Sequence, residues 1–284
     1  NAMAPDVVRL FEADARFQVI KKVGSGYVYL GANLEDRVLA DVRVRRALLL
    51  SLDRERLIRT LWRGLGQVTE SLLPPSHWAR NHALPTVARD LAAAKALLDE
   101  AGYPDPDGDG PRPRLTLTYK TSTDETAVLQ AQVLQAMAAE AGIALEIRSL
   151  EFATFFADVQ RGIFQLFSLT RVGIDDPDIY ALVLHSRNIP PKGANRGRYR
   201  NAEFDRLVDE GARRVLPAER LPFYLAAQEI VARDLPYISL LTRTNVAVMP
   251  AGLEGYRHFP SGELLGLREL SWRPANETVA ATRP

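Results

Sequence analysis

The middle of the chain carries the clearest alternation of hydrophobic and polar positions. Residues 114–120 (RLTLTYK) alternate as in a strand with one buried face, and so do residues 143–147. Between them, Ser122 and Glu125 form a capping box for a helix whose apolar positions continue to Ala141. A short amphipathic helix over 152–159 and a buried strand over 164–170 follow. The order strand, helix, strand, helix, strand predicts an α/β layer.

The segments before this layer predict further strands and helices. Residues 18–23 and 27–34 have the composition of two strands, and the Gly24-Ser25-Gly26 step between them predicts a hairpin turn. Residues 41–64 predict two helices, the second capped by Asp53. Residues 90–101 predict one more, with Gly102 at its end.

The C-terminal third predicts helices followed by strands. A short helix is expected over 179–185, an exposed loop over 186–200, and a helix capped by Asn201. Another helix extends toward Arg233, and Pro222 is expected to break or kink its beginning. Strands are expected around 238–241 and 246–249, and we expect the tail after Trp272 to be disordered.

Composition excludes several function classes. The chain has 284 residues, 46% of them hydrophobic and 25% charged, as in a soluble globular protein. Its net charge of +1 gives no overall attraction to nucleic acid or to an anionic membrane. The absence of cysteine excludes disulfides, thiolate catalysis and zinc–thiolate sites. Seven arginines lie between Arg43 and Arg63, and the acidic residues interleaved with them favour a solvated helix face over a nucleic-acid surface.

The beginning of the chain resembles a processed end. Met3 is internal and follows Asn1-Ala2, which looks like the remnant of an expression tag. No apolar run reaches the length of a membrane helix. We therefore expect a fragment from which a signal region is absent.

Candidate chemistry gathers where the strand over 164–170 ends. It runs into Arg171, Gly173 and a carboxylate cluster formed by Asp175, Asp176 and Asp178. Ligands of open α/β sheets bind where strands give way to loops, so this stretch is a candidate binding loop. The carboxylates are also candidates for a cation site or an acid–base pair, although their place before residue 179 favours a helix cap.

Other catalytic or metal-binding patterns are weak. The four histidines are scattered, and no nucleophile elbow or phosphate loop is present. The loop DPDGDG places Asp105, Asp107 and Asp109 like the first half of a calcium loop, but Thr116 stands where a bidentate glutamate is needed. We interpret it as a surface turn, with calcium binding as the alternative. We expect no metal, no cofactor and no enzyme activity.

Seven segments together resemble the family 5 extracellular solute-binding proteins, the dipeptide-, oligopeptide- and nickel-binding components of ABC importers. The order and spacing of the segments carry the resemblance, which covers about residues 27 to 260. The segments are DVRVRRALLLSLDRERLI (41–58), AAAKALLDEAGYPDPDGDG (92–110), AEAGIALEI (139–147), DDPD (175–178), GRYRNAEFDRLVDEGA (197–212), ERLPFYLAAQEIVARDLPYISL (219–240) and GLEGY (252–256).

The resemblance implies a type II periplasmic-binding-protein fold, of which this chain is the C-terminal half. Residues 35–245 would form the second ligand-binding lobe, a mixed sheet flanked by helices. Residues 1–34 would be a remnant of the first lobe with the crossover strands, and residues 246–284 would return to that lobe and end in a tail.

The resemblance also implies candidate site residues. Peptide-binding members carry an amine-binding aspartate and a preceding tryptophan in this loop, and Gly173 and Thr170 stand at those places here. Ordinary peptide binding is therefore not expected without a substitute, for which Arg171 and Asp175 are the candidates, and Arg171 would favour a carboxylate-bearing ligand. Tyr119 and Lys120, at the end of a neighbouring strand, are further candidates.

The implied function is capture of a peptide or similar small polar solute by closure of two lobes. The expected partners are that ligand and an ABC membrane permease, with no nucleic acid. We expect a monomer that is periplasmic or membrane-anchored outside the cytoplasm. Two alternatives stay open: a ligand-sensing domain of a transcriptional regulator or sensor, and a hydrolase using Asp175, Asp176 and Asp178.

Overall fold

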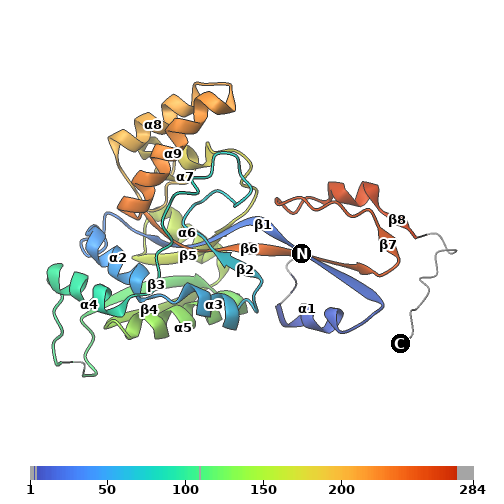
Figure 1. The fold of residues 1–284 in the computed structure, drawn as a ribbon. Coiled ribbons are helices and arrows are strands. Elements are labelled where there is room, and N and C mark those ends of the chain that lie inside the picture. The colour runs from blue at the N-terminus through green and yellow to red at the C-terminus, as the bar shows by residue number, and fades with distance from the viewer. Residues whose placement is uncertain (1–2, 4, 109, 274–284) are drawn as a thin grey trace.

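A six-stranded mixed sheet, in the order β2-β6-β1-β5-β3-β4, organises the chain (Figure 1). The computed structural model describes residues 3, 5–108 and 110–273. β3 runs parallel to both of its neighbours, β4 and β5. β1 pairs antiparallel with β5 and β6, and β2 pairs antiparallel with β6. The strands are β1 (Phe17–Ala32), β2 (Gly66–Val68), β3 (Leu115–Ser122), β4 (Ile143–Leu150), β5 (Leu166–Arg171) and β6 (Tyr237–Pro250), with β7 (Leu253–Glu254) and β8 (Ser271–Trp272) in a second small sheet.

Helices cover both faces of the sheet, which confirms the predicted α/β class with a mixed sheet. One core lies under α2 (Val42–Ser51), α3 (Arg54–Thr60), α4 (Leu91–Glu100) and α5 (Glu125–Ala139). The other lies under α6 (Phe152–Arg161), α7 (Ile179–Leu184), α8 (Ala202–Ala212) and α9 (Pro217–Asp234). The remaining helices are α1 (Pro5–Glu12) and two short 3₁₀ helices, η1 (Ser186–Asn188) and η2 (Leu264–Glu269).

Side-chain caps begin several helices, at Asp53 and Asn201 as predicted and at Asp90 in addition. The side chains of Asp53, Asp90 and Asn201 each accept a backbone N–H bond from the first turn of the helix that follows. The predicted capping box at Ser122 is wrong. Ser122 ends β3, and Asp124 caps α5 by accepting from the N–H of Ala127, 2.9 Å away.

The predicted hairpin at Gly24-Ser25-Gly26 is also wrong, because β1 is one continuous strand. It pairs antiparallel with β6 from Phe17↔Pro250 to Gly31↔Tyr237, with an irregularity between Val23 and Tyr27. A Cβ at Gly24 would overlap the side-chain amide of Asn245, so the glycine lets β6 cross closely over a bulge. The two strands predicted within 238–249 are likewise the single strand β6.

β1 and β6 extend beyond the main sheet into a second, smaller body. Their outer halves pack with α1 and with the segment of β7, β8 and η2, on the right in Figure 1. Gln18 of β1 donates to the Leu253 carbonyl of this segment. The protein thus consists of two bodies joined by two long antiparallel strands. The predicted disordered tail lies, beyond Arg273, outside the described residues.

Two features of the helices differ from expectation. Pro222 does not break α9, which runs unbroken from Pro217 to Asp234 and holds the proline near its beginning. The arginines of 43–63 are not all solvated, because Arg45 and Arg54 are buried. Arg45 donates to carbonyl oxygens at the end of α9, including Leu235 O at 2.9 Å, and so holds α2 against that helix.

Candidate ligand-binding site

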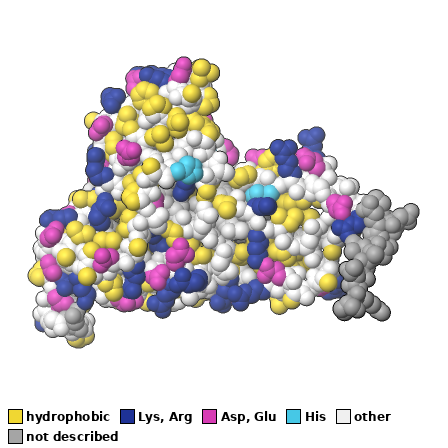
Figure 2. Space-filling view, in the orientation of Figure 1, with side chains coloured by type: hydrophobic (Ala, Val, Ile, Leu, Met, Phe, Trp, Pro, Cys, Tyr) yellow, Lys and Arg dark blue, Asp and Glu magenta, His cyan; other side chains and the backbone are white. Residues whose placement is uncertain are grey.

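The end of β5 leaves the sheet close to the junction of the two bodies. β5 pairs with β1 through Arg171, but with β3 only at Leu166 and Phe167. The loop that follows contains Gly173, whose φ of +66° is in the left-handed region and whose missing Cβ faces open space. Thr170 and Asp175 are exposed. Figure 2 shows a notch in the surface between the body that carries α8 and α9 and the C-terminal segment.

The far side of this loop is fastened to α9. Arg220 donates to Asp176 Oδ1 and to Asp178 Oδ1, both at 2.9 Å, and the Tyr224 hydroxyl also donates to Asp178. Asp178 precedes α7 but makes no capping bond with its side chain, whereas Asp176 of the same cluster accepts from the Asp178 N–H at 2.8 Å. The loop is therefore held by a charged clamp at 176–178, while residues 172–175 remain outside it.

A second contact holds the loop through His77. The ring Nδ1 accepts from the Ala79 N–H at 3.1 Å, which leaves the proton on Nε2, 3.2 Å from the Asp175 carbonyl oxygen. Burial lowers the pKa of His77, so the ring is neutral at pH 7. Trp78 lies beside it with the Arg220 guanidinium 5.6 Å from its ring centre. The segment around 77–78 thus contacts both the loop and the arginine that holds it.

The Arg220 clamp has a pH-dependent effect on stability. Arg220 holds the pKa of Asp176 below its ordinary value of 3.8. A carboxyl group with a lowered folded-state pKa contributes its full stability above the unfolded value and loses it as the pH falls through the folded one. The clamp therefore stabilises the fold at neutral pH and weakens below pH 3.8.

Replacing Arg220 by glutamine is expected to lower the free energy of unfolding by about 1–2 kcal/mol at pH 7, because two partly exposed carboxylates lose their charged donor. Urea unfolding of both proteins at pH 7 and at acidic pH checks this. The difference in the free energy of unfolding between the wild type and Arg220→Gln should decrease at acidic pH, where Asp176 becomes protonated. Arg206→Gln, at an exposed position of α8, removes the same charge and should change stability little. If the two proteins differ in the free energy of unfolding by the same amount at both pH values, the ion pairs of Arg220 do not stabilise the fold as stated.

The carboxylate cluster is poorly suited to hydrolysis. Asp176 and Asp178 share Arg220, and the lowered pKa of Asp176 keeps it ionised rather than ready to give a proton. Within the described part of the chain, no group of three or more histidine and acidic side chains is arranged to hold a metal.

The DPDGDG turn is closed by its own backbone. Asp105 Oδ1 accepts from the N–H groups of Asp107 and Gly108, at 3.1 and 2.8 Å. Asp107 Oδ2 accepts from the Arg112 N–H at 3.0 Å. Asp109 lies outside the described residues. The described contacts are those of the predicted surface turn.

Tyr119 and Lys120, both on β3, bond to neighbouring side chains of the chain itself. The Tyr119 ring is fully buried, its hydroxyl donates to Ser168 Oγ at 2.8 Å, and burial raises its pKa to about 12. Lys120 Nζ lies 2.7 Å from Asp158. Of the six predicted site residues, four therefore stand together at the end of β5 and in its loop: Thr170, Arg171, Gly173 and Asp175.

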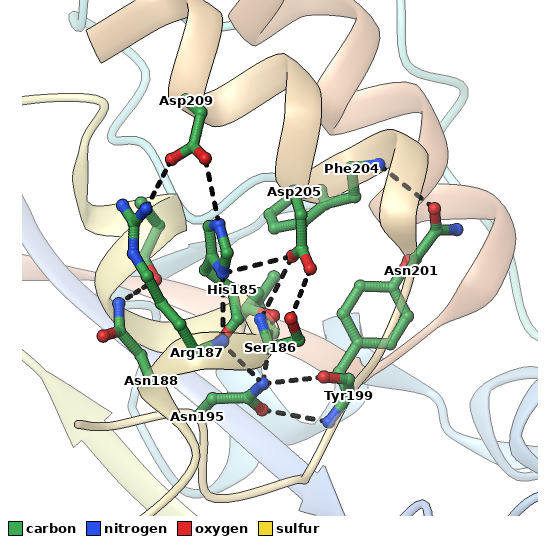
Figure 3. Close-up of polar contacts among 12 residues, drawn as sticks. His185, Ser186, Arg187, Asn188, Asn195, Tyr199, Asn201, Phe204, Asp205 and Asp209 are labelled. Carbon is green, nitrogen blue, oxygen red and sulfur yellow. Dashed lines mark hydrogen bonds and ion pairs between the residues drawn. The ribbon is translucent and has the colours of Figure 1, made fainter. Parts of the chain in front are cut away.

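The segment 186–200, predicted to be an exposed loop, is held by bonds to its neighbours. Asn195 is fully buried, and its side chain bonds to the backbone of Leu184, His185 and Tyr199 (Figure 3). His185 lies between Asp205 and Asp209 of α8, with a nitrogen 3.5 Å from each carboxylate. The prediction of exposure fails at Asn195, Gly197 and Tyr199, which are buried, and Asn195 bonds to four backbone groups at the two ends of this segment.

Several residues that shape the site were not predicted. Arg220 lies 44 positions beyond Asp176, and His77 lies 98 positions before Asp175. No local pattern links these residues to the loop, so a single sequence holds no signal for them.

The structure has one more hollow, away from β5. It is open, about 310 Å³ in volume, and lies in the C-terminal segment. Its lining residues are Arg257, Phe259, Leu265, Arg268 and Glu269.

In the described part of the chain, every helix is too short or too polar to span a membrane.

Comparison with known proteins gives a consistent picture. A family model described as bacterial extracellular solute-binding proteins, family 5 middle, matches residues 1–190. Heme-binding protein A of Haemophilus influenzae is 27% identical over 91% of this chain and 47% of its own length. The dipeptide-binding protein of Escherichia coli K12 is 24% identical over 91% of this chain and 48% of its own length.

The fold is similar to solved structures of whole binding proteins. The structure of HbpA2 from Haemophilus parasuis matches 95% of this chain with a TM-score of 0.83 and 24% identity, and the match covers 52% of that protein. The chain spans about half the length of the curated relatives it matches.

Proposed function

Because this chain belongs to the family 5 bacterial extracellular solute-binding proteins, we propose that it is the C-terminal half of the solute-capturing component of an ABC importer. The whole protein would take up its ligand between two lobes that close about a hinge. The ligand is a peptide or a similar small polar solute. This proposal includes a location outside the cytoplasm, periplasmic or membrane-anchored, a membrane permease as partner, a monomeric state and no catalytic activity.

One observation carries the proposal: β1 and β6 run without interruption through both bodies, and the candidate loop after β5 lies beside their junction. A pair of strands shared by two lobes is the kind of connection about which lobes rotate. The proposal keeps the division into 1–34, 35–245 and 246–284, with residues 35–245 as the second lobe.

The ligand-binding surface in this proposal is the end of β5 and its loop. Thr170, Arg171, Gly173 and Asp175 are the proposed contacts, with Arg220 and His77 as the residues that position the loop. Tyr119 and Lys120 are left out, because one is fully buried and the other is paired with Asp158.

Calorimetry on the complete protein and on this chain tests the proposal. With a mixture of di- and tripeptides, the complete protein is expected to bind and to become more compact in X-ray scattering. This chain is expected to bind at least about 100-fold more weakly, because half a cleft cannot bury the 70–90% of ligand surface typical of a closed site. Equal affinity of the two proteins, or binding without compaction, would refute capture by closure.

A further inference from the structure

The side chain of Arg171 faces the core under α6–α9 and is not fully paired. Side chains alternate along β5, and Phe167 and Leu169 pack in that core, so Arg171 follows on the same face. Its Nε is buried and has no hydrogen-bond partner within the described residues. A buried donor without a partner costs free energy, so its presence at the end of a strand calls for an acceptor.

A second arginine, Arg196, approaches the same region from another segment. Its Nε donates to Gln160 Oε1 at 3.2 Å, and its guanidinium lies 4.9 Å from the centre of the Phe156 ring, both on α6. Arg196 follows Asn195, which is fixed by the four backbone contacts drawn in Figure 3. Its position is therefore set by rigid neighbours rather than by a mobile loop.

Both arginines lie beside one pair of buried tyrosines. The rings of Tyr29 and Tyr237 are 4.4 Å apart. Burial raises the pKa of each tyrosine, and both Arg171 and Arg196 act against that increase at both hydroxyl groups. The strand register agrees for Arg171, because Tyr29 pairs with Leu169, two positions before Arg171 on the same face of β5.

No carboxylate of the described chain neutralises either arginine: neither Arg171 nor Arg196 lies within ion-pair distance of an acidic side chain in residues 3, 5–108 and 110–273. The acidic residues that follow Arg171 in the sequence either form ion pairs with another residue or are exposed to solvent. Asp176 and Asp178 bind Arg220, and Asp175 is exposed. Two half-exposed cations without a counter-charge among the described residues favour an anion supplied from outside.

We propose that Arg171 and Arg196, beside Tyr29 and Tyr237, form an anion subsite that receives a carboxylate group of the ligand. The inference rests on the proposed function and names the group of the ligand that this surface would bind, a carboxylate such as the C-terminus of a peptide. The planar fork of an arginine suits bidentate contact with a carboxylate, and the adjacent Gly173 leaves open space for the rest of the ligand.

Titration of this chain with succinate and with succinamide, at constant ionic strength, tests the proposal. The two probes have similar size but differ in charge. Calorimetry should show saturable millimolar binding of succinate and at least about 10-fold weaker binding of succinamide. Arg171→Gln should weaken succinate binding by about 10-fold or more, whereas the matched control Arg206→Gln, at an exposed position of α8, should not.

A second variant covers the case in which Arg171→Gln does not fold. Arg171→Lys keeps the charge but loses the fork, and should weaken succinate binding by several-fold while leaving the thermal midpoint close to that of the wild type. Equal binding of the two probes, no saturable binding of succinate, or equal effects at positions 171 and 206 would overturn the anion subsite.

The outcome separates this inference from the proposed function. If the complete protein closes equally well on peptides with a free and with an amidated C-terminus, the subsite is wrong and the transport role stands. If succinate binds through Arg171 but the complete protein does not close on any ligand, the subsite stands and the two-lobe mechanism fails.

Discussion

Replacing Arg54 by alanine is expected to lower the free energy of unfolding by about 3–5 kcal/mol, because it leaves a partly buried glutamate without its partner. The Arg54 side chain is 2% exposed. Its Nη2 lies 2.6 Å from Glu70 Oε1, and its Nη1 lies 3.1 Å from Oε2. The same guanidinium donates to backbone carbonyls of Thr69, Val87 and Ser239. One side chain thus joins α3, the segment after β2 and β6.

Chemical denaturation with circular dichroism measures the effect, and Arg56→Ala is the matched control. Arg56 lies on the same helix but is exposed, so its loss should change stability by about 0.5 kcal/mol or less. Since a domain is typically stable by only 5–15 kcal/mol, the Arg54 variant should show a clearly lower denaturation midpoint. Similar midpoints for the two variants would mean that the Arg54 contacts contribute little to stability.

Replacing Phe167 by alanine is expected to cost about 3–5 kcal/mol, since it removes a large ring from the core under α6–α9. Phe167 is fully buried and meets the Phe164 ring edge-on, with ring centres 4.8 Å apart. Its ring also lies directly over Gly31 of β1, where an added Cβ would overlap it. Only glycine at position 31 leaves room for the Phe167 ring. The effects of substitutions at positions 31 and 167 on stability should therefore depend on each other.

A double-mutant cycle checks this coupling. Gly31→Ala alone should destabilise the protein by about 1–3 kcal/mol through overpacking. In the Phe167→Ala background the same change should be neutral or stabilising, because the added methyl enters the cavity. Additive effects of the two substitutions would contradict the overlap. Phe152→Ala is the control, because that ring is 55% exposed and should cost far less.

The sequence predicted the parts of the fold that depend on neighbouring residues. Asp53 and Asn201 cap their helices as predicted, because the acceptor and the N–H groups lie within three residues of each other. The prediction failed at Gly24–Gly26, where the glycines accommodate β6, more than 200 positions away. It also failed at Arg45 and Arg54, whose buried partners include Leu235 and Ser239.

The candidate site follows the same rule. Thr170, Arg171, Gly173 and Asp175 were found together because one strand end places them in succession. Arg196, which approaches Arg171 only through the folded chain, was not found. For Lys120, the strand pattern predicts only its place at the end of β3. It does not reveal the ion pair with Asp158 of α6, 2.7 Å away.

The shared pair β1 and β6 restricts how the two bodies are able to move. Sliding of one strand along the other would break the whole ladder from Phe17↔Pro250 to Gly31↔Tyr237, and separation would expose both backbones. Bending and twisting of a two-stranded ribbon keep those bonds, and they are easiest where the ladder is already irregular, between Val23 and Tyr27. If the two bodies rotate relative to each other, we therefore expect the axis to pass through this irregular stretch, which contains Gly24 and Gly26.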